Sequence, residues 1–306
     1  MSDFKPVGHI AIACANILWG LMSPVAKLVL SAGLITPLLL TEFRMAGATV
    51  LFWTAALFVR KEHVPACDLM RLAGAAMLGI LFNQGCFIFG VGLSSPGEAS
   101  IITTTMPMWV MLLAALILHE PITWKKAGGI ILGATGAIIL VTGNNQSGQS
   151  GSNPMLGDIL VLLAQLSYAL YLTFYRNFIR KYSLVTLMKW MFLFATIASL
   201  PFAIPTMAAT RWSCITAAQW GGTAYVVIGG TFIAYICVME GQKKLRPTIV
   251  GMYNYVQPIV ASAIGVVLGM DRFGVSKGIA VALIFAGVYL VTISRALPSD
   301  SKPSAP

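Results

Sequence analysis

Two stretches of this chain decide its fold: residues 96–110, PGEASIITTTMPMWV, and residues 247–261, PTIVGMYNYVQPIVA. Each stretch begins with a proline and has a second proline eleven positions later, and the two align at a constant offset of 151 residues. The same offset relates further pairs along the chain: Gly90 with Gly241, Glu120 with Asp271, Lys126 with Lys277, and Gly136 with Gly287. The sequence is therefore a duplication.

The composition places the duplicated chain in a membrane. Of its 306 residues 58% are hydrophobic and 10% are charged, and the mean hydropathy is +0.83, which is too apolar for a water-soluble domain. The apolar segments are continuous rather than alternating, so they predict helices and not a β-barrel. Ten segments are long enough to cross roughly 30 Å of hydrocarbon: 9–31, 35–59, 70–93, 96–118, 124–142, 155–177, 184–206, 217–239, 245–269 and 274–294.

The positive charges set the expected orientation. The net charge is +10, but the basic residues lie in short loops between the predicted spans, so they indicate topology and not nucleic-acid binding. Placing the N-terminus in the cytoplasm puts 14 of the 20 lysines and arginines on the inner side. We therefore predict a multi-pass protein of the cell membrane (inner or plasma membrane) with both termini in the cytoplasm.

A turn-rich, uncharged stretch divides the chain into two halves. Residues 143–154, GNNQSGQSGSNP, read as a flexible linker between five spans in residues 9–142 and five in residues 155–294, with residues 295–306 as a cytoplasmic tail. Because five is an odd number, the second half enters the membrane from the opposite side. The expected fold is an all-α integral membrane protein of ten transmembrane helices in two inverted five-helix repeats.

The inner prolines of the two stretches predict broken helices. Pro107 and Pro258 each lie about 16 Å beyond the start of their span, close to the bilayer midplane, and proline removes one helical hydrogen bond. The residues before them are unusually polar for that depth. These candidates for the lining of a substrate pocket are Thr103, Thr104, Tyr253, Asn254 and Gln257. The alternative is that they only satisfy the backbone at the kink and hold helices together.

Polar and aromatic residues at comparable depth in other spans extend the candidate pocket. They are Asn16, Trp19, Asn83, Gln84, Gln165, Tyr168 and Tyr235. A single residue of this kind is more often an interhelical packing contact, but as a set they favour a pocket. The front ends of the repeats align at slightly different offsets, with Trp19 matching Tyr168 and Glu42 matching Lys189.

Charges inside the spans are few. Glu42 lies within reach of Lys27, so either an ion pair or proton coupling through a carboxyl in low dielectric is open. Arg44 and Lys189 either anchor against helix carbonyls or attract an anionic group of a substrate. The five cysteines and three histidines show no metal-ligand spacing, so no metal site, disulfide framework or cofactor is predicted.

These features together resemble the EamA-type branch of the drug/metabolite transporter superfamily. The resemblance is carried by Asn16-Ile-Leu-Trp-Gly in the first span, Pro107 in the fourth, Glu120 after it and the glycine-rich fifth span. It covers nearly the whole chain and implies two EamA repeats and export or exchange of small metabolites. The second half departs from the pattern, because Met270-Asp271 stands where such repeats often have Gly-Glu.

The function predicted from these patterns is secondary transport. No GxxxxGK[ST] motif occurs, so the expected process is alternating access around a midplane pocket, without ATP. The expected substrates are amino acids or related neutral or zwitterionic metabolites, with coupling to protons left open. The alternatives are an integral membrane enzyme, for which no catalytic cluster is visible, and a non-transporting scaffold or channel. GxxxG pairs such as Gly129 and Gly133 favour packing within one chain, so the partners expected are the bilayer and, at most, a weak dimer of a monomeric chain.

Overall fold

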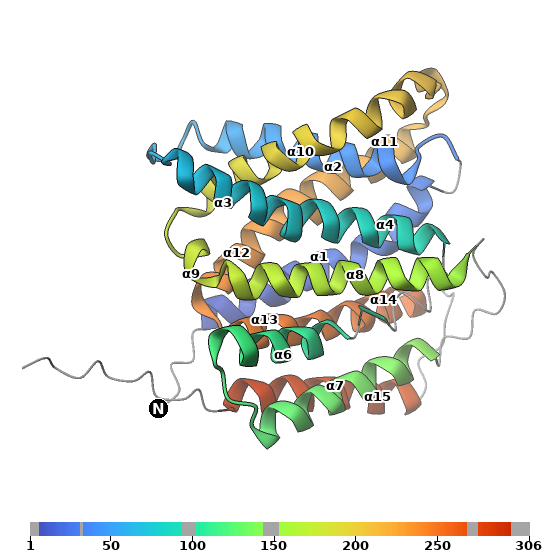
Figure 1. Ribbon diagram of the computed structural model, residues 1–306. Coiled ribbons are helices and arrows are strands. Elements are labelled where there is room, and N and C mark those ends of the chain that lie inside the picture. The colour runs from blue at the N-terminus through green and yellow to red at the C-terminus, as the bar shows by residue number, and fades with distance from the viewer. Residues whose placement is uncertain are drawn as a thin grey trace, which may run out of the picture.

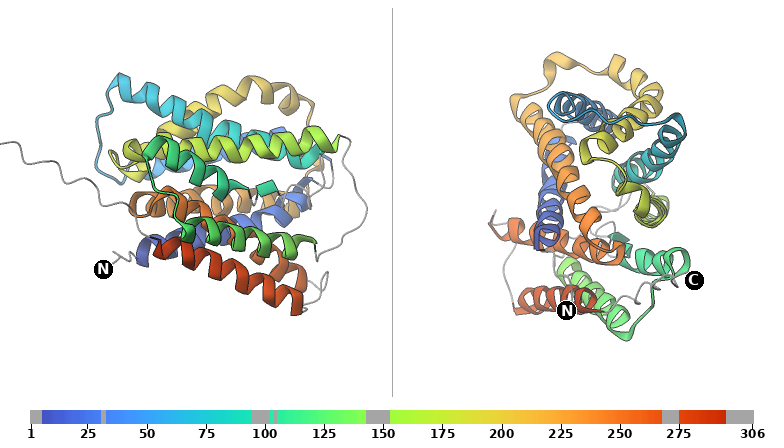
Figure 2. Two further views of the ribbon diagram at one scale, coloured as in Figure 1. Left: turned by 60° about the horizontal axis from the view of Figure 1, so that its bottom comes forward. Right: turned by 90° about the vertical axis from the view of Figure 1, so that its left-hand side faces the viewer.

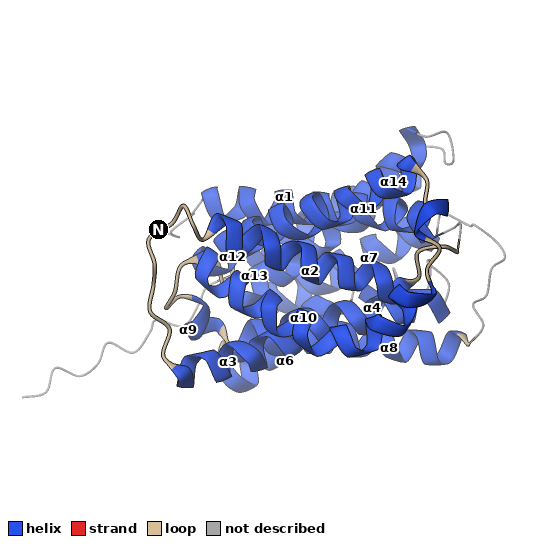
Figure 3. Ribbon diagram, turned by 90° about the horizontal axis from the view of Figure 1, so that it is seen from above, coloured by secondary structure: helices blue, strands red, loops and turns tan. Residues whose placement is uncertain are grey.

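The computed structural model describes residues 6–30, 33–93, 102–103, 105–142, 153–267 and 275–294, and within them the chain is helical without strands (Figures 1 and 3). The first half contains α1 (Pro6–Leu30), α2 (Pro37–Ala55), α3 (Ala66–Ala76), η1 (Met77–Phe82), α4 (Asn83–Leu93), α6 (Met106–Leu118) and α7 (Trp124–Thr142). The second half contains α8 (Pro154–Phe174), α9 (Arg176–Ile179), α10 (Leu184–Ala209), η2 (Trp212–Cys214), α11 (Ala217–Val227), η3 (Ile228–Ile233), α12 (Ala234–Lys244), α13 (Pro247–Met252), η4 (Tyr253–Tyr255), α14 (Val256–Val267) and α15 (Val275–Ile293).

Several helices join end to end into longer segments, and the described helices correspond in order to the ten predicted spans. The segments α3, η1 and α4 follow one another directly along the chain, as do α11, η3 and α12, and α13, η4 and α14. Four of the described helical runs are by themselves long and apolar enough to cross a membrane: Ala66–Gly90, Met155–Phe174, Leu184–Ala209 and Ala217–Lys244. The described helices agree in length and composition with the predicted all-α membrane fold.

Helix starts are fixed by local capping chemistry. The Thr36 hydroxyl accepts a hydrogen bond from the Leu39 amide (3.2 Å) immediately before Pro37 at the first position of α2. Ser183 and Thr216 cap α10 and α11 in the same way. The second crossing is shorter than the predicted 35–59, because the helical backbone gives way to turns after Ala55.

Both repeats carry the same irregularity in their third crossing. The π-helical segments η1 and η3 begin at Met77 and Ile228, which are 151 residues apart, the offset that relates the two prolines. A π turn widens the helix by one residue and frees backbone groups at that level, and such turns are frequent at functional sites. The duplication therefore extends to a local distortion that composition alone does not predict.

The two halves pack reciprocally. α1 packs on α12 and α14, and its counterpart α8 packs on α4 and α6. α2 packs on its own counterpart α10, and α7 on α15, at opposite margins of the molecule (Figures 1 and 2). Reciprocal contacts of this kind are those of an approximate two-fold axis. The axis passes through the α2–α10 contact and the α7–α15 contact, in each of which a helix packs on its own counterpart. It therefore runs across the helices, in the plane of the membrane, as an inverted repeat requires.

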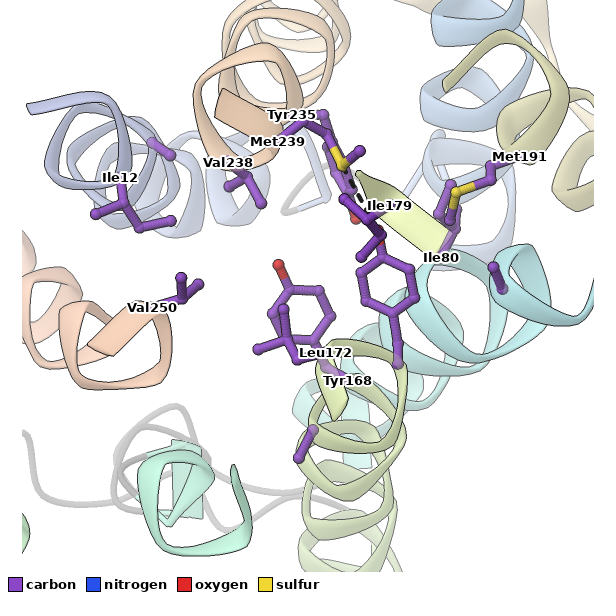
Figure 4. Packing of buried hydrophobic residues seen from close by; sticks show 14 of the residues in the cluster. Ile12, Ile80, Tyr168, Leu172, Ile179, Met191, Tyr235, Val238, Met239 and Val250 are labelled. Carbon is purple, nitrogen blue, oxygen red and sulfur yellow. Dashed lines mark hydrogen bonds between the residues drawn. The ribbon is translucent and has the colours of Figure 1, made fainter. Parts of the chain in front are cut away.

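The core lies around this axis. Buried residues from α1, α8, α10, α12 and η1 form one apolar cluster, which Tyr168 and Tyr235 enter from α8 and α12 (Figure 4). Glycines allow the closest backbone approach where α7 crosses α15, since a Cβ on Gly287 would lie 2.5 Å from the Gly129 carbonyl oxygen. The GxxxG glycine Gly129 is thus used for packing within the chain.

Candidate functional site

Three aromatic rings meet where the two repeats face each other. Trp19 of α1 lies edge-on to Tyr168 of α8, with ring centroids 6.4 Å apart, and edge-on to Tyr235 of α12 at 5.8 Å. Trp19 and Tyr168 occupy equivalent positions of the two repeats. The indole Nε1 of Trp19 donates a hydrogen bond to the Gly230 carbonyl oxygen (3.0 Å), inside the π-helical segment η3. The π turn thus supplies the acceptor that orients this ring.

A second pair of equivalent residues meets beside the rings. The side-chain amide of Gln84 donates to the Tyr235 hydroxyl (2.6 Å), and the two positions are 151 apart in the chain. Both residues are buried. The carbonyl oxygen of Gln84, Oε1, is buried and has no hydrogen-bonding partner among the described residues. An orphan acceptor at this depth is costly to the protein.

Amide side chains form a third cluster at the broken ninth crossing. The Gln257 Nε2 group donates to the Asn16 Oδ1 atom (2.9 Å) and to the Asn254 Oδ1 atom (3.1 Å). The Asn16 amide in turn donates to the Ile12 carbonyl (2.8 Å), within α1. The cluster therefore ties the first crossing of one repeat to the helix break of the other.

The helix break itself precedes the proline. α13 ends at Met252, one 3-10 turn follows over Tyr253–Tyr255, and Pro258 lies near the start of α14. Pro107 likewise stands in the first turn of α6, where its missing amide hydrogen costs nothing. Thr103 is half-buried before that turn, and Thr104 lies outside the described residues.

Other predicted pocket residues have separate surroundings. The Asn83 amide donates to the Ala164 carbonyl (3.0 Å), an interhelical contact between α4 and α8. The Tyr253 hydroxyl pairs with His9 Nδ1 (2.9 Å). Gln165 is buried at the position equivalent to Asn16. The predicted set therefore divides into an aromatic centre, an amide cluster and contacts that hold neighbouring helices.

Glu42 is fully buried between the self-paired helices α2 and α10. Its Oε2 atom accepts a hydrogen bond from the Ser199 hydroxyl (2.5 Å), and its Oε1 atom has no partner among the described residues. The side chain of Lys27, the predicted ion-pair partner, lies outside the described residues.

Three residues with polar contacts in the interior were not predicted from the sequence. Ser199 binds Glu42, Thr231 accepts from Arg44, and Gln242 bridges Tyr168 and Tyr171 through its amide nitrogen (3.0 Å) and oxygen (3.3 Å). Gln242 directly follows the repeat-paired Gly241, which is a signal that could have found it. Serine and threonine are too common in membrane helices for their type alone to mark a site.

One end of the molecule, which we call the basic end, is closed by charged contacts between the repeats. Glu120 after α6 accepts from Lys126 (2.9 Å), from Arg176 of the second repeat (3.3 Å) and from Thr248 at the start of α13 (3.2 Å). Asp68 of α3 pairs with Lys181 and Tyr182 in the loop before α10. These contacts join the ends of six crossings, from both repeats.

The loop carboxylate Glu62 adds a further contact between repeats at the basic end. It accepts from the Ser183 amide (2.9 Å) and hydroxyl (2.8 Å) at the start of α10. Partial burial raises the pKa of Glu62, but hydrogen bonds from Thr186 and Ser183 and the charge of Lys243 outweigh it, so the net pKa is lowered. The hydrogen bond to Asp68 raises the pKa of Lys181. Both shifts favour the charged forms.

Comparison with known proteins supports the resemblance inferred from the sequence. Residues 6–142 and 155–293 each match the EamA-like transporter family. The chain is 25% identical to "Uncharacterized transporter YetK" of Bacillus subtilis, covering 97% of this chain and 90% of that protein. It is 27% identical to "Uncharacterized inner membrane transporter YedA" of Escherichia coli K12, covering 94% and 91%. A solved crystal structure matches with a TM-score of 0.76 at 18% identity over 93% of this chain and 96% of that one.

The chain belongs to the EamA-like transporter family, within the drug/metabolite transporter superfamily. It is a multi-pass transporter of the inner or plasma membrane and not an enzyme. The predicted family, the all-α fold with two repeats and the transporter class are thereby confirmed.

Proposed function

We propose that the protein exports small neutral or zwitterionic metabolites, such as amino acids and related compounds, by secondary transport. The two halves, residues 9–142 and 155–294, rock about a midplane pocket, joined by the linker 143–154, with residues 295–306 as a cytoplasmic tail. The pocket is lined by Trp19, Tyr168 and Tyr235, with hydrogen-bonding groups from Gln84 and from the amide cluster at the broken helix.

The observation that carries this proposal is the meeting of equivalent residues on the repeat axis. Trp19 faces Tyr168, and Gln84 binds Tyr235. In transporters built from inverted repeats, the substrate site lies at the repeat interface near the midplane, because both halves can keep contact with it as they rock. Aromatic faces and uncharged amides suit neutral or zwitterionic metabolites better than polycations.

The basic end supports alternating access. Charged contacts at Glu120, Asp68 and Glu62 join the two repeats there, so opening that end requires them to separate. We place this end in the cytoplasm, because it gathers the basic residues of the inner loops. On this assignment, a single cysteine at position 64 or 183, introduced on a cysteine-free background, resists an impermeant reagent added outside intact cells. Labelling from outside would overturn the orientation.

Proton coupling through Glu42 is the second part of the proposal. The buried Glu42 carboxyl has one oxygen without a partner among the described residues, which can accept a proton, and its Ser199 donor lies on the other repeat. A change in its protonation therefore changes the contact between α2 and α10. Protonation could in this way be linked to the rocking of the halves.

Substrate exchange in proteoliposomes tests the proposed function. Vesicles preloaded with single amino acids and related metabolites should take up the same labelled compound for at least one member of the panel. Trp19→Ala should reduce that uptake about tenfold, because the ring contacts both tyrosines. Trp53→Ala is the matched control, since Trp53 is an exposed ring on α2. Uptake of no member of the panel, or equal losses in the two variants, would contradict the proposal.

A further inference from the structure

Arg44 is a buried cation that has no acidic partner among the described residues. The residue is 4% exposed, although it lies seven positions into α2, within the membrane. No described carboxylate lies within 4.0 Å of its guanidinium nitrogens. Glu42, two positions earlier on the same helix, binds Ser199 instead. An unpaired buried charge is expensive, so a partner supplied from outside the chain is expected.

The guanidinium is held by one edge only. Arg44 Nε donates to the Thr231 hydroxyl oxygen (3.0 Å), and that hydroxyl donates to the Val226 carbonyl (2.8 Å). Thr231 belongs to the π-helical segment η3, one turn before Tyr235. Tyr235 is close enough to Arg44 for the two side chains to interact electrostatically. The two terminal nitrogens form no hydrogen bond to a described residue. They present the fork that binds a carboxylate through two parallel bonds.

The other repeat shows that the fold does not need this cation. Thr49 and Thr196 are equivalent residues, 147 apart, and their hydroxyls are hydrogen-bonded (2.9 Å). At the same spacing the counterpart of Arg44 is Met191, and at 151 the counterpart of Thr231 is Ile80. Both counterparts are buried in the core, on the packed elements α10 and η1 (Figure 4). At these equivalent positions, therefore, one pair is apolar, Met191 and Ile80, and the other pair is the charged Arg44 with the polar Thr231.

We infer that Arg44, held in place by Thr231, forms the anion subsite of the central pocket and binds the carboxylate of the substrate through its terminal nitrogens. One guanidinium balances one carboxylate, which favours a zwitterion over a multiply charged phosphate ester. Gln84, bonded to Tyr235, offers its unpartnered Oε1 atom to the ammonium group of the same molecule. The inference rests on the proposed transport function and narrows its substrates to compounds with one carboxylate and one amino group.

The first test needs no substrate. Arg44→Met, and Arg44→Met combined with Thr231→Ile, recreate the apolar pair of the other repeat. In the purified ligand-free protein they should unfold at the wild-type temperature or above it, because a buried unpaired charge is removed. Lys189→Met is the control: its ammonium lies over the Trp53 and Trp190 rings (5.1 and 5.9 Å), away from the pocket. Loss of several degrees in both Arg44 variants, but not in the control, would make Arg44 a structural residue and overturn the inference.

The second test uses matched compounds in the exchange assay. Phenylalanine, leucine and methionine are compared with their carboxamides, which keep the amino group and side chain but lack the carboxylate. Wild type and Lys189→Met should prefer each acid over its amide by about tenfold or more, and Arg44→Met should lose this preference. Equal uptake of acids and amides by wild type, or a preference retained by Arg44→Met, would overturn the subsite while leaving transport intact. If wild type moves neither series nor any other member of the panel, the proposed function fails, and the unfolding temperatures still decide whether Arg44 is structural.

Discussion

The two five-helix repeats share a scaffold and differ in chemistry. The π-helical segments η1 and η3 are separated by the same 151 residues as the two inner prolines, and the helix contacts between repeats are reciprocal. The side chains at equivalent interior positions nevertheless differ, in size for Asn16 and Gln165 and for Trp19 and Tyr168, and in chemical type for Glu42 and Lys189, Arg44 and Met191, and Gln84 and Tyr235. On the proposed mechanism, the shared backbone geometry lies where the two halves move together, and the differing side chains lie where one asymmetric molecule is recognised.

The largest effect is expected where the scaffold is symmetric. In Gly287→Leu the new Cβ would lie 2.5 Å from the Gly129 carbonyl oxygen and 2.8 Å from the Gly133 nitrogen, both backbone atoms that cannot move aside. Overpacking of this kind costs about 3 kcal/mol, and we expect most of the protein to be lost from the membrane fraction or to unfold well below the wild-type temperature. Gly128→Leu, where a Cβ would meet nothing within 4 Å, is the control. A Gly287→Leu protein as stable as Gly128→Leu would contradict the close crossing of α7 and α15.

The next effect tests an asymmetric position. Glu42→Gln keeps the size of the side chain but cannot exchange a proton, so uptake driven by a pH gradient should fall by about tenfold or more while equilibrium exchange stays near the wild-type rate. Lys189, its counterpart, lies over two indole rings, and Lys189→Met should leave both rates unchanged. Equal pH-driven rates in wild type and Glu42→Gln would remove the coupling role, and a parallel loss of exchange and stability would make Glu42 structural.

Substitutions in the amide cluster should have smaller effects. Gln257→Ala removes both hydrogen bonds that join Asn16 and Asn254, so binding of a transported compound should weaken by about 1 kcal/mol, or roughly fivefold. Asn254→Ala should behave alike in binding titrations on folded protein. Asn145→Ala in the linker is the control. If neither Gln257→Ala nor Asn254→Ala changes the affinity, the pocket lies elsewhere and the prolines only shape the packing.

The smallest effect concerns the contact of Glu62 with the start of α10. Its folded-state pKa is lowered below the ordinary 4.5, so the ionised carboxylate adds stability above that value and loses it as the pH falls through the folded-state pKa. The unfolding temperature of wild type should therefore fall more steeply below pH 4.5 than that of Glu62→Gln. At pH 7 the two should differ by less than about 1 kcal/mol, as for a partly exposed contact. Parallel pH profiles would show that Glu62 contributes nothing to the closed basic end.

The fold could be predicted from the sequence because hydropathy and repeated prolines act over whole segments. The ends of the crossings were less predictable, since Thr36, Ser183 and the turn after Ala55 depend on local backbone geometry. For the candidate site, the search for polar and aromatic residues near the middle of the spans selected Trp19 and Gln84. It could not show that their partners are Tyr168 and Tyr235, because pairing across the axis is set by tertiary packing.

The same limit explains the residues that were missed. Thr231 and Ser199 acquire their roles only through side chains that arrive from the other repeat, Arg44 and Glu42. Asn83 shows the opposite outcome, because a polar residue at pocket depth makes a contact between neighbouring helices. The sequence pattern indicates how deep a residue lies in the membrane and what type of side chain it has. The direction in which that side chain points around the helix axis depends on how the neighbouring helices pack.

The central claim is that substrate binds where equivalent residues of the two repeats meet. It is tested most directly by an experimental structure of the protein with a compound that the exchange assay shows to be transported. The account predicts that the compound lies within about 4 Å of Trp19, Tyr168 and Tyr235. A compound bound instead beside Leu172, Arg176 and Pro247, at the small void near the basic end, would contradict it.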